Sequence, residues 1–157
     1  MNLTRYESPL GSILLAADQT GLTGLWFVGQ KYFPSFSDGD FFENETPVLT
    51  EAKHWLSLYF SGKEPDFLPP LHPQGSSFRQ AVWNVLLTIP RGQTMTYGEI
   101  ARRLNVRSAQ AVGGAVGHNP ISILIPCHRV VGSDGSLTGY AGGLARKEWL
   151  LHLEGAR

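Results

Sequence analysis

A proline-rich stretch near the middle of the sequence divides the chain into two parts of different character. Residues 66–75 contain three prolines and a fourth precedes them, so this stretch favours an extended connection over a helix or a central strand. The 157 residues suffice for one ordinary domain or for two small domains that share an interface. We therefore predict a first domain over residues 1–70 and a second domain over residues 71–157.

The two predicted domains carry opposite net charges. Residues 1–70 hold four basic and nine acidic residues, whereas residues 71–157 hold nine basic and four acidic residues. Eight of the nine basic residues of the second domain are arginines, whose guanidinium groups suit phosphates and base edges. This distribution indicates that the second domain faces an anion, although a chance bias of a solvated surface would give the same counts.

The first domain has the pattern of a small sheet followed by one helix. Apolar runs at residues 13–17 and 22–28 lie between turn residues, as strands of a hairpin do. The polar and aromatic residues 29–46 are predicted to form a long loop. A helix is predicted from Pro47 to about Phe60, with Thr46 as its N-cap.

The second domain has the pattern of several short helices. One is predicted over residues 77–88, and a second begins after Thr96, where Glu99 completes a capping-box pattern. After a break at residues 105–108, a further helix is predicted over residues 109–116, which gives a helix-turn-helix. The fold class is therefore α+β, with a small N-terminal sheet and helix domain followed by a mainly helical C-terminal domain with a (winged) helix-turn-helix.

The last of these helices is rich in glycine, which costs about 1 kcal/mol relative to alanine inside a helix. The missing side chains allow the backbone to approach another surface closely. That surface could be a helix of the same protein or the groove of a nucleic acid, and small residues alone do not decide between the two.

Cys127 is the only cysteine, which excludes an internal disulfide and a zinc site made of four cysteines. A lone cysteine is most often a small buried hydrophobic residue. Here His128 and Arg129 follow it, and positive surroundings lower the pKa of a thiol. Glu154 could orient the histidine, as the third member of a nucleophile–base–acid set. Because neighbouring side chains of an extended segment point to opposite faces, a water would bridge Cys127 and His128 unless the backbone turns.

A series of short motifs runs through the second domain in a fixed order. Residues 125–131 read Ile-Pro-Cys-His-Arg-Val-Val, and they are accompanied by the motifs at residues 96–101, 111–113, 117–120, 139–143 and 150–155. This ordered set resembles the O6-alkylguanine-DNA alkyltransferases, also called methylated-DNA–protein-cysteine methyltransferases, over about residues 78–155. Residues 1–70 resemble the variable first domain of that family only loosely.

The resemblance implies a DNA repair reaction that consumes the protein. The thiolate of Cys127 would take the alkyl group from O6 of a guanine flipped out of double-stranded DNA and keep it as S-alkylcysteine; reaction with O4-alkylthymine stays open. His128 would act as base through a water, Glu154 would hold His128, and Asn119 would stabilise the turn that carries the active-site segment. No cofactor is implied, and a first domain without cysteine does not support the structural zinc of some members.

The resemblance also assigns residues to the flipped base and to the duplex. Tyr97 would donate to guanine N3 and Tyr140 would pack on the base; the whole predicted base pocket comprises Tyr97, Pro126, Val130, Tyr140, Ala141 and Gly142. The glycine-rich helix would enter the minor groove. The predicted DNA-binding residues are Arg107, Ala109, Gln110, Ala111, Gly113, Gly114 and Arg129. Gln110 stands where many members insert an arginine wedge, and Arg107 is the alternative wedge.

Two other functions remain open from the sequence. A non-catalytic helix-turn-helix protein could flag alkylated guanine, although such relatives lack the cysteine. A cysteine hydrolase could use Cys127, His128 and Glu154 with repeated turnover. The N-terminal residues have no secretory pattern, and no apolar run reaches the roughly 18 residues of a membrane span, so we expect a cytoplasmic monomer.

Overall fold

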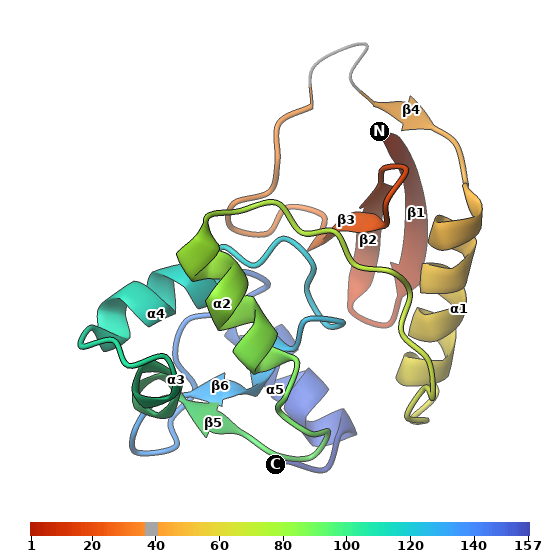
Figure 1. Cartoon of the computed structure of the whole chain (residues 1–157). Helices are drawn as coiled ribbons and strands as arrows, with labels where there is room; N and C mark the ends of the chain where they lie inside the picture. Colours follow the sequence, from red (N-terminus) through yellow and green to blue (C-terminus); the bar gives the residue numbers. More distant parts are fainter. Residues whose placement is uncertain (37–40) are drawn as a thin grey trace.

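The computed structural model describes residues 1–36 and 41–157 and has the predicted α+β architecture (Figure 1). The first part of the chain forms strands β1 (Asn2–Ser8), β2 (Gly11–Ala17), β3 (Leu22–Phe27) and β4 (Phe42–Glu43) and helix α1 (Pro47–Phe60). The second part forms α2 (Ser77–Leu86), β5 (Met95–Thr96), α3 (Tyr97–Arg103), α4 (Ala109–Gly117), the 3-10 helix η1 (Cys127–Arg129), β6 (Val130–Val131) and α5 (Leu144–Leu153). No helix within these described ranges is long and apolar enough to cross a membrane.

The N-terminal sheet has the strand order β3-β2-β1-β4. Strands β1, β2 and β3 pair antiparallel in sequence order, and β4 adds to β1 in parallel. The prediction of a loop throughout residues 29–46 is wrong at β4, whose two side chains are exposed and carry no apolar alternation. Main-chain bonds from Phe42 N to Met1 O and from Asn44 N to Leu3 O form this strand. Residues 37–40 of the predicted loop lie outside the described residues.

Helix α1 has the predicted bounds, Pro47 to Phe60, and covers the sheet with its apolar face (Figure 1). Its buried residues recur at helical spacing; they are Leu49, Ala52, Trp55, Leu56 and Tyr59. Proline at the first helical position needs no hydrogen-bond partner, which favours a helix start there. Thr46 is the N-cap residue, as predicted, although its hydroxyl accepts no bond from the first turn.

The second part contains the predicted helix-turn-helix, formed by α3 and α4. The Thr96 hydroxyl accepts a 3.1 Å bond from Glu99 N and begins α3, and the Ser108 hydroxyl accepts a 3.0 Å bond from Ala111 N and begins α4. Asn105, with φ of 55°, turns the chain between the two helices. Helix α2 ends at Leu86, earlier than predicted, because the following residues form a tighter turn.

Strand β3 connects the two parts of the chain through its outer edge. The proline-rich connection pairs with Leu22, through bonds of 2.8 Å from Leu22 N to Pro70 O and 2.7 Å from His72 N to Leu22 O. The segment before Cys127 pairs with Leu25, through bonds of 2.8 Å to Pro120 O and 3.2 Å from Ser122 N. One hydrophobic core contains residues from both parts. The division at residue 70 stays a prediction, and the two parts are packed as one body around this core.

Candidate active site

The segment that leads to Cys127 is held by the side chain of Asn119. Asn119 Oδ1 accepts a bond from Ile121 N at 3.0 Å, and Nδ2 donates to Ile125 O at 2.8 Å and to Ile121 O at 3.3 Å. Residues 121–125 are buried, and they form turns rather than a regular strand. Asn119 is thus placed where it stabilises the turn before the cysteine.

Cys127 begins the single turn of 3-10 helix that carries it together with His128 and Arg129. The backbone therefore turns at this point, and the opposite orientation expected for an extended segment does not apply. Cys127 is only 4% exposed and His128 is fully buried. Cys127 and His128 are thus both interior, whereas Arg129 is half-buried.

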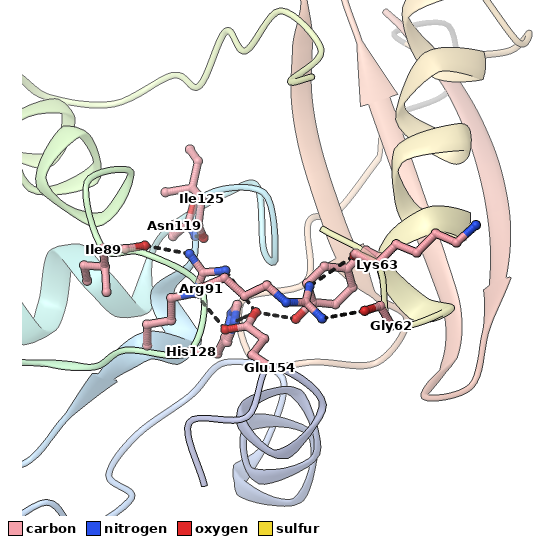
Figure 2. A network of polar contacts seen from close by, with 10 residues as sticks. Gly62, Lys63, Ile89, Arg91, Asn119, Ile125, His128 and Glu154 are labelled. Atoms are coloured by element: carbon pink, nitrogen blue, oxygen red, sulfur yellow. Dashed lines mark hydrogen bonds and ion pairs between the residues drawn. The ribbon is translucent and has the colours of Figure 1, made fainter. Parts of the chain in front are cut away.

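Glu154, directly after α5, is the centre of a buried polar network (Figure 2). Its Oε2 lies 2.7 Å from His128 Nε2 and accepts the Tyr59 hydroxyl at 2.6 Å. Arg129 donates to Oε1 from Nε at 2.8 Å and to Oε2 from Nη2 at 3.1 Å, and its Nη1 donates to Ile89 O at 2.7 Å. Four donors thus surround one buried carboxylate.

These contacts determine the ionisation states of Glu154 and His128. Burial alone would raise the pKa of Glu154, but its bonds to His128 and Arg129 and their charges lower it well below the ordinary range, so the carboxylate stays ionised. Burial lowers the pKa of His128 more than Glu154 raises it, so the imidazole is neutral at neutral pH. Because an ionised carboxylate only accepts, a neutral His128 donates its Nε2 proton to Glu154. Its Nδ1, which has no partner among the described residues, is then the basic nitrogen.

The predicted lowering of the pKa of Cys127 is wrong for the free protein. Burial raises the pKa of the thiol, and the side chain of Asn119 and the charge of Lys147 only partly oppose it. The positive charges that follow Cys127 in sequence are not available to it, because Arg129 is paired with Glu154. The thiol is therefore protonated at neutral pH and must lose its proton before it can act as a nucleophile.

A cavity of about 240 Å³ brings together residues predicted for the base and residues predicted for DNA. Its walls come from α3, from α4, from the 139–141 loop and from the loop after β3; they are Lys31, Tyr32, Tyr97, Gly113, Gly114, Gly117, His118, Gly139, Tyr140 and Ala141. The other predicted base-pocket residues lie elsewhere. Val130 is fully buried in β6, Pro126 lines a different cavity, and Gly142 is packed against the rings of Tyr140 and Phe27.

Apart from Arg129, the predicted DNA-binding residues lie on α4 or, for Arg107, just before it, and all of them are at least partly exposed there. Five of them are exposed and Gly113 is partly exposed; the exposed five are Arg107, Ala109, Gln110, Ala111 and Gly114. A Cβ on Gly114 or Gly117 would meet no atom within 4 Å, so these glycines do not serve packing inside the protein. Arg129 is the exception. The expectation that it contacts DNA does not fit its placement, because its guanidinium is bonded to Glu154 and Ile89 O in the interior.

Two functional candidates were missed in the sequence, Tyr59 and Lys147. Lys147 is fully buried on α5, and its ammonium donates to Thr138 O at 2.7 Å and to Gly139 O at 3.4 Å, which holds the loop at the cavity. Burial lowers the pKa of Lys147 to about 8. Lys147 stands three positions before Leu150 and four before Leu151, which places it on the same helix face as these apolar residues. This spacing was the available sequence signal for its burial. Tyr59 lies on the apolar face of α1, where an aromatic residue indicates core packing, and nothing local pointed to its hydroxyl partner.

The remaining histidines lie apart from this network, as expected. His118 stacks on Tyr32 with ring centroids 4.0 Å apart, and His72 bonds to Asp18 at 2.7 Å. Within residues 1–36 and 41–157, no group of three or more His, Cys, Asp or Glu side chains could hold a metal ion.

Comparison with known proteins agrees with the motif pattern. The sequence matches the family models "6-O-methylguanine DNA methyltransferase, ribonuclease-like domain" over residues 1–73 and "6-O-methylguanine DNA methyltransferase, DNA binding domain" over residues 77–156. A methylated-DNA–protein-cysteine methyltransferase of Methanosarcina acetivorans is 47% identical over 152 residues, which cover 96% of each chain. A protein of the same name from Mycobacterium tuberculosis is 44% identical over 96% of this chain and 90% of its own.

The fold of the whole chain is also similar to a solved structure of the same kind. The crystal structure of Mycobacterium tuberculosis OGT in complex with DNA has a TM-score of 0.89 at 41% identity, covering 99% of this chain and 94% of that chain. The matched family models together span both parts of the sequence, and the relatives are matched over nearly their full length. The chain therefore belongs to the 6-O-methylguanine DNA methyltransferase family.

Proposed function

We propose that this family member repairs double-stranded DNA by transferring the alkyl group of O6-alkylguanine to Sγ of Cys127, once per chain. The observation that carries the proposal is the buried turn in which Cys127 is followed directly by a His128 bonded to Glu154 at 2.7 Å. Family membership supports the reaction, and the names of the two relatives describe it.

The first chemical step removes the thiol proton. His128 donates through Nε2 to Glu154, so its Nδ1 can accept the proton of Cys127 through a water. The charge of Lys147 and the side chain of Asn119 both favour the thiolate. Burial opposes ionisation of the Cys127 thiol in the free protein. We infer that the thiol loses its proton only during the transfer itself. A thiol that stays protonated until then is protected from other electrophiles.

The second step is a displacement at the alkyl carbon. Sγ of Cys127 forms a bond to this carbon while the bond from carbon to O6 breaks, and the bonding pair stays with the guanine. Tyr97 is placed at the cavity wall, where its hydroxyl can donate to N3 and neutralise the leaving base. The protein keeps the carbon as a thioether, so no second turnover follows.

The guanine must leave the duplex to reach this site, which costs a few kcal/mol. We propose that α4 enters the minor groove, as its exposed small residues leave room for the sugar-phosphate walls. Arg107 and Gln110 stand exposed on this side and are the candidate contacts to the vacated position. The proposal also includes a monomer that acts in the cytoplasm, as expected from the sequence; light scattering during size exclusion tests the monomer.

The reaction is tested by the intact mass of the protein after incubation with duplex DNA that contains O6-methylguanine. We expect a gain of one CH2 unit per chain, located on Cys127 by peptide mapping, and no further demethylation by the modified protein. An unmodified protein that binds the DNA would instead support the non-catalytic alternative. Repeated turnover without modification would support the hydrolase.

Replacement of Gln110 by alanine is expected to slow repair of duplex DNA about tenfold, because a flipped state without a wedge is less populated. Reaction with free O6-benzylguanine, which needs no flipping, should keep its rate. Single-turnover rates on both substrates measure the difference, with Gln93→Ala at another exposed position as the control. Equal losses on the two substrates would argue against a wedge at Gln110.

Replacement of Gly114 by alanine is expected to stabilise the protein and weaken its binding to duplex DNA. The added methyl group meets no atom of the protein and removes the penalty of glycine in a helix, about 1 kcal/mol. The same methyl group would stand between the α4 backbone and the groove. Urea unfolding and fluorescence anisotropy with labelled duplex measure the two effects. A more stable variant with unchanged DNA affinity would mean that this face of α4 does not approach DNA.

A further inference from the structure

The network around Glu154 includes one hydroxyl from the N-terminal part of the chain. Tyr59, on α1, donates to Glu154 Oε2 at 2.6 Å, although 95 residues separate them in sequence. His128 Nε2 lies 2.7 Å from the same oxygen. The carboxylate oxygen that orients the proposed base is therefore shared with a donor from the other half of the protein.

Tyr59 is held in place by its neighbours on α1 and by an arginine from the second half. Its ring stacks on Trp55 with centroids 5.2 Å apart and meets Phe60 edge-on at 5.4 Å. The guanidinium of Arg91, a residue of the second half of the chain, lies 5.4 Å from the ring centroid. The ring is 1% exposed, so the hydroxyl has little freedom to leave Glu154.

Arg91 also joins the end of α1 to the second half. Its Nη1 donates to Lys63 O and its Nη2 donates to Gly62 O, both at 3.2 Å (Figure 2). These two carbonyls directly follow the last turn of α1, so Arg91 fixes the position of the helix end relative to Glu154. The contact between Tyr59 and Glu154 is thus accompanied by a second connection between the end of α1 and the second half of the chain.

We propose that Tyr59 is a positioning residue for alkyl transfer: its hydroxyl fixes the Glu154 oxygen that holds His128, so that the N-terminal half completes the catalytic network. This inference rests on the roles proposed above for His128 and Glu154. It also gives the acidic first half of the chain a task in the reaction, separate from any contact with DNA.

The Tyr59 hydroxyl has a second effect, which is on the pKa of His128. By donating to Oε2 it neutralises part of the carboxylate charge that would otherwise stabilise an imidazolium at His128. The other charged and titratable groups near His128, Glu154 and Tyr59 come from every element packed there; they are Cys127, Arg129, Tyr140, Lys147 and Arg91. A Tyr59→Phe change leaves all of them in place and removes only the hydroxyl.

The test compares single-turnover transfer by wild type and Tyr59→Phe on duplex DNA containing O6-methylguanine, from about pH 5 to pH 9. We expect the plateau rate to fall about tenfold, because Glu154 then holds His128 in the productive orientation less of the time. We also expect the acidic limb of the profile to move to higher pH, since a more basic carboxylate raises the pKa of His128. Loss of packing alone would lower the rate without moving this limb.

A matched control uses Tyr6, a tyrosine whose hydroxyl bonds to a residue of α1. Tyr6 OH lies 3.3 Å from Ser57 Oγ on that helix, and its ring stacks on Phe60. Tyr6→Phe removes a hydroxyl of the same kind, away from Glu154, and should leave both the rate and the pH profile unchanged. Thermal unfolding of both variants shows whether each is folded at the assay temperature.

A double mutant separates this inference from the function on which it rests. In a Glu154→Gln background, Tyr59→Phe should slow transfer less than twofold, because its route of action is already removed. A tenfold loss in both backgrounds, or an unchanged rate and pH profile in the single variant, would overturn the role of Tyr59. If Glu154→Gln itself transfers at the wild-type rate, the proposed function of the network fails, whatever Tyr59→Phe does.

Discussion

Replacement of Cys127 by alanine is expected to abolish methyl uptake from O6-methylguanine DNA. Sγ is the atom that forms the new bond to carbon, and no other cysteine exists in the chain to replace it. Loss of a nucleophile costs on the order of a million-fold in rate, so no mass increase should be seen during a practical assay. Intact mass spectrometry of the protein, together with digestion of the DNA to nucleosides, measures both partners of the reaction.

The same variant should keep its fold and its affinity for DNA. Cys127 is a small buried side chain of the core, so alanine leaves the core nearly filled, and α4 is unchanged. Anisotropy with a duplex that contains O6-methylguanine provides the control. Removal of the methyl group from DNA by a folded Cys127→Ala protein would refute the assignment of the nucleophile.

Replacement of Glu154 by glutamine is expected to slow alkyl transfer by about a hundredfold, at the lower end of what general acid–base catalysis contributes. Glutamine can keep one contact to His128, but it has no charge to stabilise the imidazolium that forms when His128 takes the proton. DNA affinity should stay near that of wild type, because Glu154 is buried beside α5 and away from α4. Single-turnover kinetics and anisotropy measure the two quantities separately. A variant that lost DNA affinity at an unchanged transfer rate would contradict the orienting role.

The Glu154→Gln variant should also be less stable, because Arg129 is left with its charge partly buried and unpaired. Removal of one partner of a buried ion pair costs about 3 kcal/mol. The pKa of Glu154 is lower in the folded protein than in the unfolded chain, so the carboxylate stabilises the fold above about pH 4.3 and this contribution declines as the pH falls. The difference in stability between wild type and variant should therefore shrink in acid. Glu148→Gln, on the exposed face of α5, is the matched control and should change neither stability nor rate.

The features that depend on neighbouring residues in sequence were largely predictable. The bounds of α1, the cap at Thr96 and the helix-turn-helix follow from local patterns, and the structure has them. The set of Cys127, His128 and Glu154 was predicted from residue types and order, and the structure joins the last two at 2.7 Å.

The features that depend on distant partners could not be predicted in this way. Strand β4 has no apolar alternation and exists because β1 offers an edge. The pKa of Cys127 follows from burial rather than from the charges beside it in sequence, since Arg129 turns inward to Glu154. Tyr59 shows the same limit, because its pattern indicates only an apolar face, whereas its function depends on an oxygen contributed by the end of α5.

The attachment of the active-site segment to the edge of β3 has a consequence for how the first half can vary. The hydrogen bonds of Leu25 with Pro120 and Ser122 join main-chain atoms, as do those of Leu22 with Pro70 and His72. Any residues that keep a strand in this place would supply the same donors and acceptors. The amino acids of the first half can therefore diverge widely while the segment that carries Cys127 keeps its place at the edge of β3. The condition is that the Tyr59 hydroxyl at the end of α1 still reaches the Glu154 carboxylate.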